Sequence, residues 1–163
     1  SKTGKIGLAA TEATVKSGRF AGEIEKRTGQ AVTAVPCPRL APMVESGMAP
    51  DDPALAAAVA EYCKPFLRDG VDTVVLGCTH YPLAATAFAA VLGEGVTLID
   101  CAAEAAKAAA EALKKAHLLA GGTAPAAPRY YFTALPPEAA RQTARRLLGE
   151  DFTPQLAKPG DKG

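Results

Sequence analysis

TVVLGCTHYPL, residues 73–83, runs from a buried strand into the start of a helix and carries polar chemistry at the junction. Residues 73–77 form a short apolar run with two adjacent valines, which is typical of a strand covered on both faces of a parallel sheet. A helix is predicted over residues 83–92. Cys78, Thr79 and His80 therefore follow the carboxyl end of a strand, where ligands bind in open parallel sheets.

Three further apolar runs repeat this pattern and alternate with segments of helical spacing. The runs are residues 5–10, 31–36 and 96–100, and helices are predicted over residues 14–27 and 52–68. Strands that alternate with helices predict an α/β fold, in which one parallel sheet has helices on both faces. Pro65 is expected to distort the second of these helices or to end it early.

The pattern changes after residue 100. An alanine-rich helix is predicted over residues 101–119 and a flexible linker over 120–128. A strand (129–134), a helix (136–149) and a frayed tail (151–163) complete the chain. One strand and one helix cannot enclose a core, so this segment is expected to dock on another body. Without that body, its strand is expected to be unpaired or to add to an exposed sheet edge.

Composition excludes several classes of protein. The 163 residues include 48% hydrophobic ones, enough for a core, and 18 basic and 17 acidic residues give a net charge of +1. That balance, with 6% aromatic residues and no Trp, argues against nucleic-acid binding. No apolar run is long enough to span a membrane, and no secretory signal is evident. Four separated cysteines without a CxxC pair indicate free thiols in the cytoplasm, with neither a disulfide scaffold nor a zinc site.

Cys78 is the strongest candidate for chemistry. A helix that begins near Pro82 would present its N-terminus to this thiol and favour the thiolate form. His80 could exchange a proton with the thiol, and Thr79 with neighbouring N–H groups could hold a carboxylate. The alternatives are a buried structural cysteine, a solvated histidine and a threonine that only caps the helix.

Other polar residues also follow strand ends. Glu45 lies in a loop marked by proline and glycine, and could contact an ammonium group, orient a histidine or remain solvated. Thr11 and Thr14 follow the first strand and could line a cleft or cap a helix. The remaining cysteines, for which a structural role is predicted, are Cys37, Cys63 and Cys101.

Four stretches resemble the glutamate racemase family. They are IGLAATEATVKSGRF (6–20), CPRLAPMVESG (37–47), DTVVLGCTHYPL (72–83) and VTLIDCAAEAA (96–106). GCTHYP is the most specific of these motifs, since the related aspartate racemases have a GCT motif that is typically followed by Glu. The final strand and helix are also similar to those of the family, so the resemblance covers nearly all of the chain.

The resemblance implies a cofactor-independent inversion of glutamate at Cα, which supplies D-glutamate for peptidoglycan. Two cysteines on opposite sides of the carbon transfer the proton, and Cys78 matches the second of them. His80 and Glu45 match residues that assist it, and Thr79 matches a substrate-binding threonine; Thr11 and Thr14 are further candidates for substrate binding. The implied ligands are L- and D-glutamate, and a homodimer is possible.

Members of the family have two similar α/β domains, and this sequence departs from the family pattern in the first of them. The family's first cysteine, in a motif resembling ACNTA, and its Asp-Ser-Gly motif do not occur in this sequence. Residues 1–105 are therefore expected to be a complete second domain, followed by helix and linker (106–128). Residues 129–150 would belong to a first domain whose N-terminal part is missing. The chain is expected to be inactive alone; the alternatives are a non-catalytic α/β binding domain and an aspartate-type racemase.

Overall fold

The computed structural model describes residues 1–120, 132–133, 138, 141–142, 144–145 and 155–156. The chain divides into two compact units, Ser1–His117 and Leu118–Gly163, which are described separately. No helix in these described stretches is long and apolar enough to cross a membrane.

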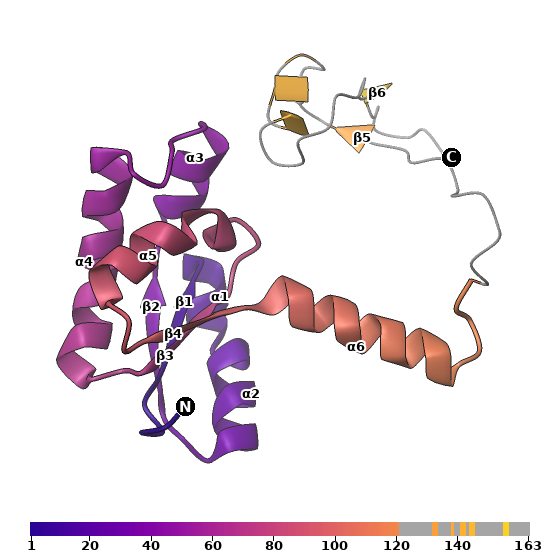
Figure 1. Cartoon of the computed structure of the whole chain (residues 1–163), viewed down its shortest axis with the longest axis horizontal. Coiled ribbons are helices and arrows are strands. Elements are labelled where there is room, and N and C mark those ends of the chain that lie inside the picture. The colour runs from indigo at the N-terminus through magenta and orange to yellow at the C-terminus, as the bar shows by residue number, and fades with distance from the viewer. Residues whose placement is uncertain (121–131, 134–137, 139–140, 143, 146–154, 157–163) are drawn as a thin grey trace. The chain divides into compact units, whose positions relative to one another are not determined.

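A four-stranded parallel sheet forms the centre of the first unit (Figure 1). Its order is β2-β1-β3-β4, and every neighbouring pair is parallel. The bounds are β1 Ile6–Ala10, β2 Val32–Pro36, β3 Thr73–Leu76 and β4 Thr97–Asp100. The four predicted strands are confirmed, each shorter by one residue at one end.

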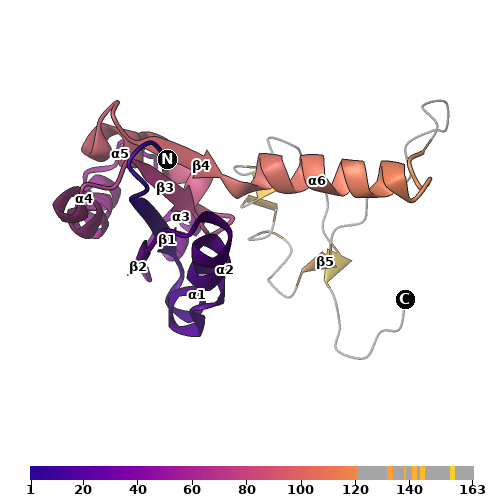
Figure 2. The same ribbon diagram turned by 90° about the horizontal axis from the view of Figure 1, so that it is seen from below.

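Helices cover both faces of the sheet, which confirms the predicted fold class. Figure 2 shows α1 (Glu12–Ser17) and α2 (Arg19–Thr28) on one face and α4 (Pro53–Asp69) and α5 (Ala85–Leu92) on the other. On the first face, Leu8 and Val75 of the sheet pack against partly buried residues that include Phe20. On the second face the core includes fully buried side chains of α4 and α5, among them Val59, Phe66 and Phe88.

One helix prediction was wrong in its bounds, and one helix was not predicted. The helix predicted over 14–27 is divided at Gly18, which adopts φ 65° and ends α1; glycine takes this left-handed conformation at little cost. A helix not predicted from the sequence, α3 (Leu40–Glu45), occupies the Pro- and Gly-marked segment. Burial of Leu40 and Val44 stabilises it despite its short length.

Pro65 does not end α4, so of the two effects predicted for it, an early end of the helix was wrong. The helix continues to Asp69, and Gly70 caps it in the left-handed conformation. Cys63 and Phe66, on either side of the proline, are both fully buried. This packing offsets the hydrogen bond that proline removes, because tertiary burial supplies most of a helix's stability.

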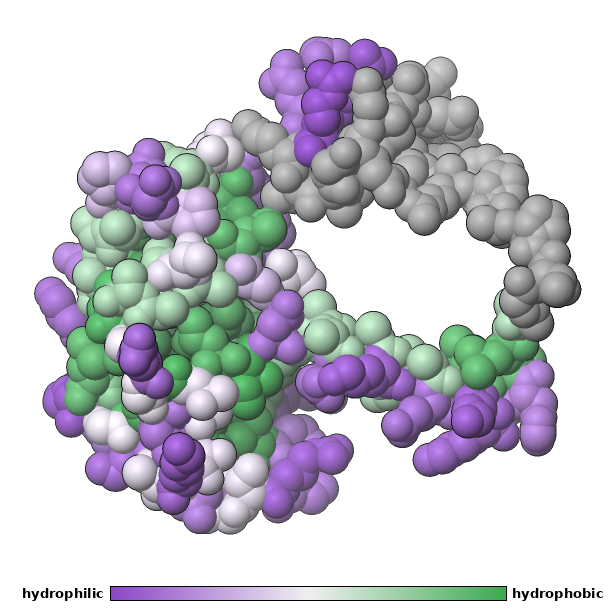
Figure 3. Space-filling model, viewed as in Figure 1, coloured by the Kyte–Doolittle hydropathy of each residue, from purple (hydrophilic) through white to green (hydrophobic). Residues whose placement is uncertain are grey.

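The alanine-rich helix α6 (Cys101–Lys115) has no buried residue. It begins where the Asp100 side chain accepts a hydrogen bond from Ala102 N at 2.8 Å, and it ends before the predicted residue 119. Figure 3 shows apolar residues along one side of this helix and polar residues along the other. Leu113 on α6 is 43% exposed.

The second unit contains a short parallel pair of strands. β5 (Phe132–Thr133) pairs with β6 (Gln155–Leu156). The expectation that this strand is unpaired or adds to a sheet edge was therefore wrong, because its partner comes from the segment predicted to be frayed. Residues 138, 141–142 and 144–145 are helical, within the predicted final helix. The linker predicted at 120–128, apart from residue 120, and the rest of that helix lie outside the described residues.

Gly77, at the end of β3, is required by close packing. A Cβ at this position would lie 2.6 Å from Leu8 Cδ1 and 3.3 Å from Ala9 O. Because Leu8 is fully buried and cannot move aside freely, we expect Gly77→Ala to lower the free energy of unfolding by about 1–3 kcal/mol in urea titrations.

Gly22→Ala is the matched control for this prediction. Gly22 lies in α2, and a Cβ there would meet nothing within 4 Å. The same substitution should raise stability by up to about 1 kcal/mol, since alanine favours helix. Equal effects at the two glycines would contradict the packing argument.

Candidate active site

The carboxyl ends of the parallel strands bring several predicted site residues to one edge. In the pairing of β1 with β3, Ala9 lies opposite Leu76. Thr11 and Cys78 each follow two residues later, so the register brings both to the same edge of the sheet. Cys37 and Cys101 follow β2 and β4 at that edge.

Cys78, His80 and Glu45 form a continuous chain of contacts. Cys78 Sγ lies 3.7 Å from His80 Nδ1, and His80 Nε2 lies 2.8 Å from Glu45 Oε1. Glu45 is the last residue of α3, whereas Cys78 and His80 follow β3, so the contact joins segments 35 residues apart. The His80 side chain is 27% exposed and that of Glu45 57% exposed.

This geometry determines where the protons can lie. An ionised carboxylate only accepts hydrogen bonds, so the short contact to Glu45 requires a hydrogen on His80 Nε2. In the neutral ring, Nδ1 then has a free lone pair that faces the thiol. Transfer of the thiol proton to Nδ1 gives a thiolate beside an imidazolium, whose charge the Glu45 carboxylate stabilises.

A helix does begin near Pro82, as predicted, but its first turn is a 3-10 helix. This short 3-10 helix, Tyr81–Ala84, separates Cys78 from α5, which begins only at Ala85. The N-terminus of α5 lies seven residues after Cys78, and the ionisable side chain in contact with the thiol is His80. This turn begins with Tyr81 N donating to Cys78 O at 3.1 Å.

Sequence reasoning missed Tyr81. Its side chain is fully buried, and its hydroxyl donates to the carbonyl oxygen of Cys37 at 2.9 Å. Burial raises the pKa of this hydroxyl above its ordinary range, so it remains a donor. The available signal was the tyrosine's position within the GCTHYP motif, directly after the polar residues.

The three predicted substrate-binding threonines have different surroundings. Thr11 caps α1 by accepting from Thr14 N at 3.3 Å, and the two hydroxyls lie 2.9 Å apart. Thr79 is exposed beside Cys78. Among the described residues no hydrogen bond joins Thr11 or Thr14 to the Cys78–His80–Glu45 chain, so they share its edge without contacting it.

The other cysteines are held in the neutral form. Burial raises the pKa values of Cys37 and Cys63 to about 12, and both side chains are fully buried. The pKa of Cys101 is also raised, mainly by burial and secondarily by the neighbouring Asp100 carboxylate. Their raised pKa values make these three thiols poor candidates for proton transfer near neutral pH. No group of ligands suited to a metal ion is found in the described part of the chain.

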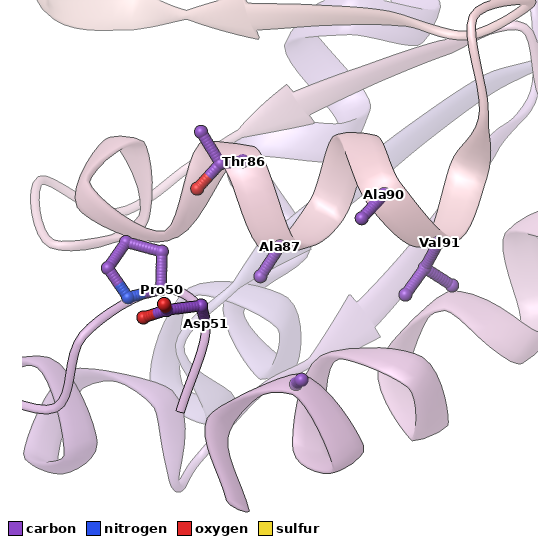
Figure 4. Close-up of a pocket in the computed structure, with 7 residues that line it drawn as sticks. Pro50, Asp51, Thr86, Ala87, Ala90 and Val91 are labelled. Atoms are coloured by element: carbon purple, nitrogen blue, oxygen red, sulfur yellow. The ribbon is translucent and has the colours of Figure 1, made fainter. Parts of the chain in front are cut away.

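Three hollows mark the surface of the first unit, and one of about 370 Å³ lies at the N-terminal segment, away from the candidate site. Another of about 270 Å³ lies beside the candidate site and is lined by Phe20, Leu76, Gly77, Cys78, Thr79, Asp100, Cys101, Ala102 and Ala105. A larger one of about 400 Å³ lies between α5 and the segment before α4 (Figure 4), where Pro50, Asp51 and Val91 contribute to its wall. None of the predicted site residues lines the larger hollow, so its size does not mark the place of the chemistry.

Comparisons with known proteins agree on one family. The protein-family model described as Asp/Glu/Hydantoin racemase matches residues 1–109 of this chain. A glutamate racemase of Mycobacterium ulcerans (strain Agy99) is 38% identical over 152 residues, 93% of this chain and 56% of the relative.

Solved structures give the same result. The crystal structure of glutamate racemase isoform RacE1 from Bacillus anthracis matches with a TM-score of 0.89 at 30% identity, covering 99% of this chain and 60% of that one. Glutamate racemase from Francisella tularensis, solved in complex with D-glutamate, matches with a TM-score of 0.82 at 26% identity. This match covers 95% of this chain and 57% of the Francisella chain. The chain thus spans a little over half the length of the proteins it matches.

Proposed function

The chain belongs to the Asp/Glu/Hydantoin racemase family, and we propose that it forms one face of a glutamate racemase active site. In the proposed reaction, a thiolate removes the proton from Cα of glutamate and a second thiol on the opposite face returns one. The first cysteine then holds a proton and the second is a thiolate, so charge and atoms balance without a cofactor. The product, D-glutamate, would serve peptidoglycan synthesis in the cytoplasm.

The contact chain from Cys78 through His80 to Glu45 is the observation that supports this proposal. The Cα proton of an amino acid is weakly acidic, so its removal needs a base that is desolvated and correctly placed. Cys78 is half-buried, and its neighbour His80 can accept the thiol proton in advance. Glu45 makes that transfer favourable because its carboxylate lies 2.8 Å from the ring that becomes positive.

The exposed threonine beside the thiol is assigned to the substrate carboxylate. Removal of the Cα proton moves negative charge onto that carboxylate, and donors aimed at it lower the barrier. Thr79 follows Cys78 directly and offers a hydroxyl and a backbone N–H. Thr11 and Thr14, at the same sheet edge, are proposed to border the substrate.

The chemistry also requires a thiol on the opposite face of Cα. Cys37 and Cys63 are fully buried, and Cys101 lies at the start of α6 without a histidine partner among its hydrogen bonds in the described residues. None of the three therefore fits this role. We assign the opposing thiol to the portion of the full-length relatives that this chain does not match. We also propose that the complete protein forms a homodimer.

Two proteins test this function. The 163-residue chain, incubated with L-glutamate in deuterium oxide, is expected to form no D-glutamate, because one thiol cannot deliver a proton to the opposite face of Cα. A chimera in which residues 1–163 replace the matched region of the Bacillus anthracis racemase should form D-glutamate. Mass spectrometry and chiral chromatography measure both outcomes.

L-aspartate is the control substrate for the chimera. We expect no racemisation of aspartate, since the proposed site follows the glutamate-type motif with His80. Turnover by the chain alone would contradict the two-thiol mechanism. A folded but inactive chimera, beside an active parent enzyme, would contradict the proposed function.

A further inference from the structure

Tyr81 joins the two segments that carry the proposed proton-transfer groups. Its backbone N–H donates to Cys78 O at 3.1 Å, within the turn that holds Cys78 and His80. Its hydroxyl donates to Cys37 O at 2.9 Å, in the loop that leads from β2 into α3. Glu45 is the last residue of α3, so one buried side chain connects both ends of the His80–Glu45 contact.

The contact between His80 and Glu45 needs such support. Both side chains are partly exposed, and exposed ion pairs hold their geometry only weakly by themselves. The loop and the turn come from strands that are not neighbours, because β1 lies between β2 and β3. No ladder of backbone hydrogen bonds therefore links the two segments directly.

We propose that Tyr81 is a positioning residue that holds α3 against the Cys78–His80 turn and so keeps Glu45 within hydrogen-bond distance of His80. This inference rests on the contact chain invoked in the proposed function. It assigns the buried hydroxyl a role in the reactivity of Cys78, although the hydroxyl touches none of the reacting atoms.

Removing this hydroxyl is a mild change for the fold. Phenylalanine keeps the buried ring, and Cys37 O still accepts a hydrogen bond from Leu40 N at 3.2 Å. The carbonyl is therefore not left unsatisfied, which avoids the larger cost of an unpaired buried polar group. A change in Cys78 reactivity can then be attributed to lost positioning.

The test measures alkylation of Cys78 by iodoacetamide in the complete 163-residue chain, resolved by site with mass spectrometry. Because the thiolate is the reacting form, the pH profile reports how well its surroundings stabilise it. We expect Tyr81→Phe to lower the rate at neutral pH about fivefold and to move the profile to higher pH, in the direction of Glu45→Gln. In the Glu45→Gln background, Tyr81→Phe should add little further change.

Tyr62→Phe is the matched control. The Tyr62 hydroxyl accepts from Arg39 N at 3.2 Å and ties the start of α3 to α4, and among the described residues it has no hydrogen bond to the Cys78 turn. Its loss should leave the Cys78 profile within about twofold of the parent. Thermal unfolding of each variant shows whether the fold is retained.

The outcomes separate the two claims. If His80→Gln slows alkylation while Tyr81→Phe matches the parent, or only lowers the unfolding temperature, the positioning role is refuted and the contact chain stands. If neither variant changes the profile, the contact chain itself is refuted, and the inference about Tyr81 fails with it. Glutamate turnover by the chimera is measured separately and is not needed for either decision.

Discussion

Changing Cys78 to alanine in the chimera is expected to slow the racemisation of glutamate at least about a thousandfold. A positioned general acid or base contributes roughly 10²–10⁴ to the rate, and Cys78 is proposed to act in both directions, as base toward one enantiomer and as acid toward the other. We do not expect His80 to replace it, because Nδ1 lies 3.7 Å from the sulfur and is proposed to exchange its proton with the thiol. Deuterium incorporation at Cα and formation of D-glutamate measure the loss.

Cys101→Ala is the matched control for this substitution. Both cysteines line the hollow of about 270 Å³, and both are half-buried. Burial and the neighbouring Asp100 raise the pKa of Cys101, which keeps it in the neutral form, so its loss should change the rate by no more than about twofold. A large loss in Cys101→Ala together with a small one in Cys78→Ala would reverse the assignment of the base.

The sheet and the position of Cys78 could be predicted from sequence because both depend on local patterns. Residues 73–76 are Thr, Val, Val and Leu, of which the first three are β-branched, and β3 forms there as expected. Parallel pairing then brings the ends of β1 and β3 to one edge, which follows from topology alone.

The partnership of His80 with Glu45 could not be assigned from sequence in the same way. Glu45 was placed in a loop, where it could equally have remained solvated. Its place is set by α3, which forms because Leu40 and Val44 are buried against the rest of the domain. The bond from Tyr81 to Cys37 spans 44 residues and likewise leaves no local trace. Pro65 was misjudged for the same reason, since local propensity took no account of the burial of Phe66.

Alkaline pH is expected to destabilise the folded chain progressively as the pH rises toward 12. Burial raises the pKa values of Cys37 and Cys63 to about 12 in the folded protein, whereas an unfolded thiol ionises near 8.5. Folded pKa values above the unfolded ones mean that stability is complete below about pH 8.5 and is lost as the pH rises toward 12. In that window each thiol lowers the free energy of unfolding by up to about 1.4 kcal/mol per pH unit. The two together can remove up to about 10 kcal/mol, which is comparable with a typical total stability of about 5–15 kcal/mol.

Urea titrations at several pH values above about 9, in the presence of a reductant, measure this slope. Cys63→Ala should reduce it by about half, because one of the two buried thiols is gone, although the small cavity lowers stability at every pH. The slope is the informative quantity, since the cavity shifts all values equally and leaves the pH dependence to the remaining thiol. An unchanged slope in Cys63→Ala would mean that this thiol ionises without unfolding, and that the core around α4 admits water more easily than its full burial indicates.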